Sequence, residues 1–338
     1  MFWRLQENVL SNQDIEGLVT FIRSTKRFTQ FERVREFEHA FSSWQGVAAS
    51  VFVNSGSSAN LLLISALKEQ QGWRDGDEIL VPAVTWPTTV TPVIQCGLKP
   101  VFVDVNLTDL SVDYDVLERH ITPRTRGIFV AHILGFPADM DRIRGVMAPR
   151  GIMIFEDACE AQGATRGTRK VGSLSSAGTF SFYWGHHMTT VEGGMVCTDD
   201  QDLYRLLLLK RSHGLARELP EEDHPALADR YSDLDFRFLF LTAGYNFRNT
   251  EFAAVLGLAQ LKCIDEFIRI RNRNYNTFAR LCGEYCDDLI LLTAEGMSSF
   301  TLPFLFRDRE DKQAFEQLIG AAGIETRPLI SGNLLMQP

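Results

Sequence analysis

The sequence Gly151-Ile-Met-Ile-Phe-Glu-Asp157 decides the fold, because it joins a continuous apolar run to a carboxylate. A short apolar run of this kind is typical of a strand that is buried on both faces. Further strand patterns lie at 48–54, 78–82, 100–104, 127–131, 179–183 and 194–198. Helical or turn segments separate most of them, and this alternation predicts an α/β domain with a largely parallel sheet. Asp157 would then lie at the carboxyl edge of the sheet, where open α/β sheets bind ligands.

Composition excludes several classes of protein. The chain has 338 residues and a net charge of −9, with 34 basic and 43 acidic residues and no basic cluster. We therefore expect no nucleic-acid partner and no anionic membrane partner. The absence of a signal peptide and of a long apolar run predicts a cytoplasmic protein. Six scattered cysteines predict reduced thiols and no metal site.

Three other features suit a flat, phosphorylated ligand. Ser55-Gly-Ser-Ser-Ala-Asn60 follows a strand and opens a helix, so its N–H groups form a candidate anion site or simply a capped turn. Asp157 can pair with a protonated pyridine nitrogen, or it can cap a helix. Trp86 follows another strand and can stack on a ring, although core packing is the alternative.

A histidine pair stands where one primary amine would be expected. His186 comes 29 residues after Asp157, His187 follows it, and no lysine occurs between Lys170 and Lys210. A pyridoxal enzyme places a lysine at this point to hold its cofactor as an imine. A histidine moves protons but cannot form that imine. The pattern predicts that the cofactor chemistry is kept while the covalent tether is absent.

Together these motifs resemble the DegT/DnrJ/EryC1/StrS sugar aminotransferase family, whose members act on nucleotide-linked keto-sugars. The resemblance spans nearly the whole chain and rests on segments 54–60, 76–82, 99–104, 156–160, 170–173, 192–195 and 244–248. It implies the fold-type-I architecture of pyridoxal-phosphate (PLP) transferases, which is that of aspartate aminotransferase. A large cofactor-binding domain, 1–245, would hold a mixed, mostly parallel sheet and an N-terminal helical segment. A smaller α+β domain, 246–338, would be incomplete at its end.

The resemblance also assigns roles to individual residues. The cofactor, as PLP or pyridoxamine 5′-phosphate, would be bound by Gly56, Ser57, Trp86, Asp157, Glu160 and Ser181, with Asn246 contributed by a neighbouring subunit of a homodimer with shared active sites. The sugar nucleotide would be surrounded by Lys26, Arg27, Phe28, Thr29, His213, Arg217, Arg248 and Glu325. Arginine suits a diphosphate because its guanidinium binds phosphate oxygens in pairs.

Histidine in place of lysine resembles the sugar 3-dehydratase branch of the family. That branch implies L-glutamate as amine donor, His186 as base with His187 as second choice, and a 4-keto-6-deoxyhexose as substrate, GDP-4-keto-6-deoxy-D-mannose being favoured. An unperturbed imidazole pKa of about 6.5 would suit such a base. Two alternatives stay open: a sugar 4-aminotransferase that uses Lys210, and a non-catalytic regulator that binds cofactor or sugar. The product would serve deoxysugar synthesis, such as that of colitose for O-antigen.

Overall fold

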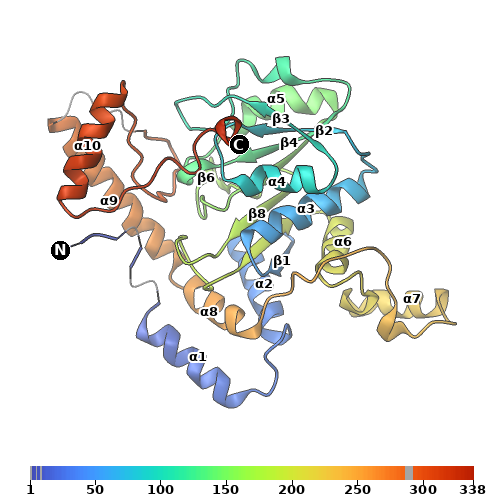
Figure 1. Ribbon diagram of the computed structural model, residues 1–338. Coiled ribbons are helices and arrows are strands. Elements are labelled where there is room, and N and C mark those ends of the chain that lie inside the picture. The colour runs from blue at the N-terminus through green and yellow to red at the C-terminus, as the bar shows by residue number, and fades with distance from the viewer. Residues whose placement is uncertain (1, 5, 8–9, 286–291) are drawn as a thin grey trace.

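A seven-stranded mixed sheet forms the centre of the computed structural model, which describes residues 2–4, 6–7, 10–285 and 292–338 (Figure 1). The strands are β1 (Ala49–Val53), β2 (Glu78–Pro82), β3 (Lys99–Val103), β4 (Thr125–Ala131), β5 (Met153–Asp157), β8 (Ala177–Ser181) and β9 (Gly194–Thr198). Their order is β1-β9-β8-β5-β4-β2-β3, and only β9 runs antiparallel to its neighbours. The predicted α/β class with a mixed, mostly parallel sheet is confirmed.

Helices cover the sheet and extend from it in two directions. They are α1 (Asn12–Ser24), α2 (Glu32–Gln45), α3 (Gly56–Gln70), α4 (Pro87–Gln95), α5 (Met140–Met147), α6 (Gln201–Arg211), α7 (His224–Arg230), α8 (Glu251–Leu261), α9 (Ile264–Tyr285) and α10 (Arg309–Ala321). The short strands β6 (Thr165–Arg166) and β7 (Arg169–Lys170) form a separate hairpin. In Figure 1, α9 leads away from the sheet toward α10, and α7 projects on the opposite side. The predicted domain boundary at 245/246 stays a prediction.

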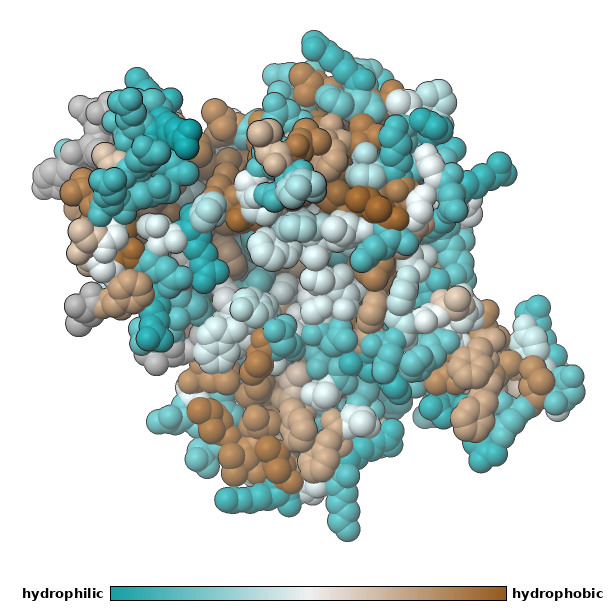
Figure 2. Space-filling model, in the orientation of Figure 1, coloured by the Kyte–Doolittle hydropathy of each residue, from teal (hydrophilic) through white to brown (hydrophobic). Residues whose placement is uncertain are grey.

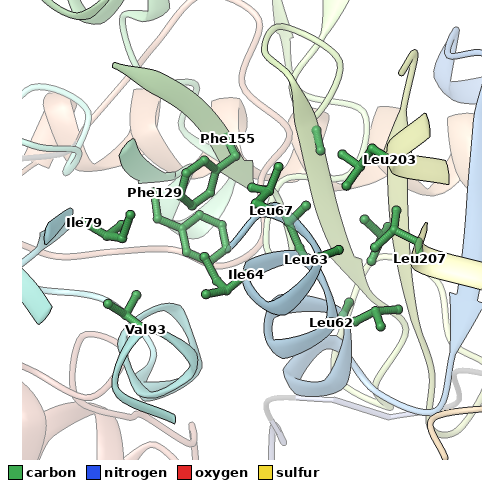
Figure 3. Close-up of a cluster of buried hydrophobic side chains, with 14 of the residues drawn as sticks. Leu62, Leu63, Ile64, Leu67, Ile79, Val93, Phe129, Phe155, Leu203 and Leu207 are labelled. Carbon is green, nitrogen blue, oxygen red and sulfur yellow. The ribbon is translucent and has the colours of Figure 1, made fainter. Parts of the chain in front are cut away.

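Helix α3 is the centre of the core. Its side chains Leu62, Leu63, Ile64 and Leu67 are fully buried, as expected for a helix that is apolar on nearly every face. They lie in one cluster with Phe129 and Phe155 of the sheet, Val93 of α4, and Leu203 and Leu207 of α6 (Figure 3). This packing fixes the first turn of α3 against the ends of β1 and β8.

The segment before α2 is held by Glu251 at the start of α8. The Glu251 carboxylate accepts hydrogen bonds from the N–H groups of Phe31, Arg33 and Val34 at 2.8–3.0 Å. Free N–H groups at the first turn of a helix need such acceptors, and a negative charge there also favours the helix dipole. Segment 26–29 is thereby held close to α8, where Thr29 forms a bridge with Thr250.

Three segments differ from what their local sequence patterns predict, which is a strand at 299–306, one continuous helix over 252–267 and no element over 331–338. Segment 299–306 forms no strand, because Pro303 lacks an N–H group and the N–H groups of Ser299 and Phe300 bond Asn272 and Leu134 instead. The apolar pattern 252–267 is split between α8 and α9. Residues 331–338 do form local structure, with Asn333 bridged to Val84 and a short turn at Leu334–Met336.

Within the described ranges, no helix combines the length and the apolar character needed to cross a membrane.

Candidate active site

The candidate site lies at the carboxyl edge of the parallel strands. Asp157 ends β5, Ser181 ends β8, and Trp86 follows β2 and precedes α4. The first turn of α3 follows β1, and the loop with both histidines joins β8 to β9. Since these strand ends share one edge of the sheet, residues from distant parts of the sequence meet there.

Asp157 is 7% exposed and firmly oriented. Its Oδ2 accepts hydrogen bonds from Asn60 Nδ2 at 2.8 Å and from Thr89 Oγ1 at 2.9 Å. Its Oδ1 accepts one from the N–H of Cys159 at 3.1 Å. Asn60 is itself fixed, because its Oδ1 accepts a bond from Thr179 Oγ1 at 2.6 Å. The carboxylate therefore holds one direction before any ligand binds.

The start of α3 and the end of β8 are in direct contact at Gly56. A Cβ added to Gly56 would lie 2.6 Å from Ser181 Cβ and 2.9 Å from Ser181 Oγ. Ser55 caps the helix by accepting the Ser58 N–H at 3.0 Å, whereas Ser57 is exposed. The first N–H groups of a helix have no partner within it, so this turn is suited to an anion.

Trp86 and Glu160 are placed differently. The Trp86 side chain is 54% exposed at the N-terminus of α4 and is free to stack on a ligand. Glu160 accepts the N–H of Leu134 at 2.9 Å, and Leu134 adopts a positive φ of 53° to present it. Burial, together with the nearby Asp157 charge, raises the pKa of Glu160 to about 7 despite this hydrogen bond.

The histidine pair is seated against Phe300. The Phe300 ring lies 5.3 Å from the His186 ring and 5.8 Å from the His187 ring, measured between centroids. His187 is almost fully buried, and its Nε2 lies 3.0 Å from Ser298 Oγ and 3.2 Å from the Ser298 carbonyl oxygen. Because Ser298 Oγ donates its hydrogen to the Gln162 carbonyl, His187 Nε2 is the donor to Ser298.

Among the described residues, Nδ1 of both His186 and His187 is buried without a hydrogen-bond partner. Burial and the nearby charge of Arg271 lower the pKa of His186 to about 4 and that of His187 to about 3. The expected imidazole pKa near 6.5 is therefore wrong for this fold. Both rings are therefore neutral at pH 7 and can accept a proton, but each is a weaker base than a free imidazole.

A polar cluster lies next to the start of α3. Asn246 forms a bridge with Ser212, and Arg248 forms one with Val53. Arg248 Nε donates to Asn246 Oδ1 at 3.0 Å, and Arg248 Nη2 lies 3.5 Å from His213 Nε2. His213 is exposed with a φ of 63°. These three predicted site residues therefore lie together.

The remaining predicted residues are more scattered. Arg217 is exposed, and its Nη1 donates to the Arg237 carbonyl at 3.3 Å. Segment 26–29 is also exposed, with the Arg27 guanidinium 3.8 Å from the centre of the Phe31 ring and Phe28 stacked on Phe252. Glu325 accepts a bond from Arg327 at 3.1 Å beside Trp3, away from the contacts that orient Asp157.

Sequence reasoning missed several residues that shape the site. Asn60 and Thr89 orient Asp157, and Leu134 orients Glu160. Asn60 stands in the motif that opens α3, so its position was a usable signal. Segment 331–334 also reaches the edge of the site. Ser331 Oγ donates to the Thr85 carbonyl, and the Leu334 N–H donates to the Ala83 carbonyl.

Lys210, the lysine of the aminotransferase alternative, is engaged elsewhere. Lys210 Nζ lies 2.7 Å from Glu69 Oε2 and donates to the Ala243 carbonyl at 3.2 Å. Glu69 stands 13 residues after Gly56 in α3, which at about 1.5 Å per residue places it about 20 Å along the helix from the anion-binding turn. Within the part of the chain that the structure describes, no cluster of three metal-binding side chains occurs.

Comparisons with known proteins agree with this geometry. The model of the DegT/DnrJ/EryC1/StrS aminotransferase family matches residues 10–338. The GDP-4-keto-6-deoxy-D-mannose 3-dehydratase of Yersinia pseudotuberculosis is 38% identical over 320 residues, which cover 93% of this chain and 81% of that protein.

Two solved structures of GDP-4-keto-6-deoxymannose 3-dehydratase are also similar. One, a variant with bound GDP-perosamine, is 34% identical with a TM-score of 0.91, and the match covers 98% of this chain and 87% of that one. The other, with a trapped PLP-glutamate geminal diamine, is 33% identical with a TM-score of 0.90 and the same coverage. The fold is thus that of PLP-dependent aminotransferases, and the chain belongs to the DegT/DnrJ/EryC1/StrS aminotransferase family.

Proposed function

We propose that the chain is a PLP- and pyridoxamine-phosphate-dependent 3-dehydratase of a nucleotide-linked 4-keto-6-deoxyhexose, with GDP-4-keto-6-deoxy-D-mannose as favoured substrate and L-glutamate as amine donor. One observation carries the proposal: the loop between β8 and β9 presents His186, and no lysine, at the edge where Asp157 and the start of α3 meet. The name of the Yersinia relative supports the same reaction class, as do the two solved structures, one with bound GDP-perosamine and one with a PLP-glutamate adduct.

The residues at this edge fit PLP. Gly56 leaves no Cβ between α3 and Ser181, so a phosphate has access to the first helical turn and the nearby hydroxyls. Asp157 is oriented by three donors, as a partner for a pyridine nitrogen must be. Nδ1 of His186 is buried without a partner, and a bound ligand would relieve that deficit. Exposed Trp86 supplies a ring for stacking.

PLP, when bound, supplies an electron sink that stabilises negative charge on the reacting carbon atoms. Asp157 holds the pyridine nitrogen in its protonated form by charge pairing. His186 accepts a proton and returns it, since its lowered pKa keeps the imidazole neutral at pH 7. Glu160, with a pKa of about 7, holds or releases a proton near Asp157 at the working pH. Trp86 would cover one face of the ring.

The aminotransferase alternative needs a lysine at the site, and Lys210 does not suit that role. Its amine pairs with Glu69, toward the opposite end of α3. Lys170, the nearest lysine before the histidines in sequence, donates to the Trp44 carbonyl and lies over the Trp44 ring. Without a lysine at this edge, no amine of the protein would compete for the cofactor, which favours dehydration over amine transfer to the sugar.

We also propose a cytoplasmic homodimer in which Asn246 and Arg248 serve the partner's cofactor and substrate. Two exposed apolar surfaces support an assembly of this kind. Figure 2 shows one over α1 and one near α7. The first includes Ile15 and Ile22, and the second includes Leu234, Phe238 and Phe240. Phe240 of the second surface forms a bridge with Leu215, two residues after His213, so a partner docked there would be near the polar cluster.

The assembly can be tested by placing a charge on the second surface. Phe238→Asp should shift the protein to monomers in sedimentation velocity and abolish activity. Leu318→Asp is the matched control, because Leu318 is 72% exposed on α10 and away from both surfaces. A fully active Phe238→Asp monomer would contradict the shared sites.

Substitution of the histidines tests the function itself. His186→Asn should stop release of the 3-deoxy sugar while PLP binding, followed by absorbance, stays within about threefold of the wild type. His187→Asn is the paired variant and should keep measurable turnover. Turnover by His186→Asn at the wild-type rate would rule out the base. The product would then supply 3,6-dideoxyhexose synthesis, such as that of colitose for lipopolysaccharide O-antigen.

A further inference from the structure

Arg271 on α9 is a charged residue next to the histidines that the proposed mechanism leaves unused. Its Nη1 donates to the Phe300 carbonyl at 3.0 Å, and the Phe300 ring packs against the rings of both histidines. The guanidinium is near enough that its charge lowers the pKa of His186 and of His187. Through Phe300, Arg271 is therefore linked to both histidine rings.

This guanidinium is partly buried, and no carboxylate of the described residues forms an ion pair with it. Burial alone lowers the pKa of Arg271. A partly desolvated cation without an anion is costly, and proteins ordinarily pair it. Among the described residues, Arg271 donates one hydrogen bond, to the Phe300 carbonyl, although a guanidinium has five N–H donors.

A purely structural role does not account for these free donors. Asn272, the next residue, already ties the same segment to α9: its Nδ2 donates to the Met297 carbonyl at 2.9 Å, and its Oδ1 accepts the Ser299 N–H at 2.8 Å. One neutral side chain thus fixes the segment at two points. A charge at the neighbouring position is not needed for that purpose.

We infer that Arg271 is the receptor for a carboxylate of the amino-acid amine donor, held beside His186. This inference rests on the proposed function and adds a binding residue to it. In glutamate, the carbon that must lose a proton carries the α-carboxylate. A cation that flanks the base therefore lies where that carboxylate has to be, and guanidinium binds carboxylate in bidentate fashion. The bound carboxylate would also offset the charge that Arg271 places on the histidines.

Glutarate, which has both carboxylates of glutamate but no amine, tests the site without turnover. Binding of glutarate to the PLP-loaded protein is measured by calorimetry for the wild type, Arg271→Gln, Arg271→Lys and Arg273→Gln. Arg271→Gln should bind about 10- to 100-fold more weakly, as expected on loss of a charge-assisted bond. Arg271→Lys should bind with intermediate affinity. Arg273→Gln, which changes an exposed arginine two residues away, should bind like the wild type.

Two further measurements separate the alternatives. Inorganic phosphate should bind equally to the wild type and Arg271→Gln, and a matching loss of phosphate binding would assign Arg271 to a phosphate instead. In histidine NMR spectra of the wild type, glutarate should raise the His186 pKa. The inference is overturned if Arg271→Gln binds glutarate as tightly as the wild type, or if its KM for glutamate is unchanged. Failure of the wild type to deaminate glutamate would instead overturn the proposed function.

Discussion

His187 gives a quantitative prediction for the pH dependence of stability. Its folded-state pKa is about 3, lowered first by burial and then by Arg271, against 6.5 for a free imidazole. In this interval the unfolded chain binds a proton that the folded chain does not. The contribution of neutral His187 to the stability of the fold is therefore fully present above pH 6.5, and it is lost as the pH falls from 6.5 toward 3. On going from pH 7 to pH 5, the titration of His187 should lower the free energy of unfolding by about 2 kcal/mol.

The prediction is checked by urea unfolding of the wild type and His187→Asn at pH 7, 6 and 5. His187→Asn should be less stable at pH 7, because Ser298 loses its donor and the core loses packing. The difference in free energy of unfolding between the two proteins should then narrow by about 2 kcal/mol on going to pH 5.

His39→Asn, which removes an exposed imidazole from α2, is the matched control, and it should keep the wild-type dependence on pH. A gap between the wild type and His187→Asn that stays constant from pH 7 to pH 5 would refute the reasoning. In that case His187 would not be held neutral by burial.

Three other predictions concern the site and its support. Gly56→Ala forces a Cβ against Ser181, so it should weaken PLP binding at least about tenfold in absorbance titrations. Gly145→Ala is the control and should bind PLP normally, because its Cβ would meet no atom within 4 Å. Glu160 has a pKa of about 7, so Glu160→Gln should remove an inflection near pH 7 from the pH–rate profile, and a persistent inflection would contradict the assignment. Glu251→Ala leaves three N–H groups without their acceptor, so it should lower the free energy of unfolding by about 2–4 kcal/mol, with exposed Glu266→Ala nearly neutral by the same denaturation assay.

Local patterns predicted the sheet well, because buried strands have a distinctive composition. The apolar run before Asp157 is β5, and the carboxylate lies at the predicted edge. The start of α3 was equally readable, since a strand followed by small and hydroxyl residues is typical of a capped helix start, which Ser55 provides. In each of these cases the signal lies within about ten neighbouring residues.

The rest of the site depends on contacts that are distant in sequence. Arg271 and Phe300 adjoin the histidines from about 85 and 114 residues away, and no local pattern marks them. The low pKa of His186 comes from burial, which only tertiary packing creates. Lys210 looked suitable because of its place in the sequence, yet α6 directs its amine to Glu69.

The sugar product of a single reaction distinguishes dehydration from amine transfer. The purified protein is incubated with PLP, L-glutamate and GDP-4-keto-6-deoxy-D-mannose, and the sugar is followed by proton NMR. Because His186 replaces the lysine, the account predicts a methylene group at C3 and release of ammonia. A 4-amino sugar that keeps its C3 hydroxyl would contradict it.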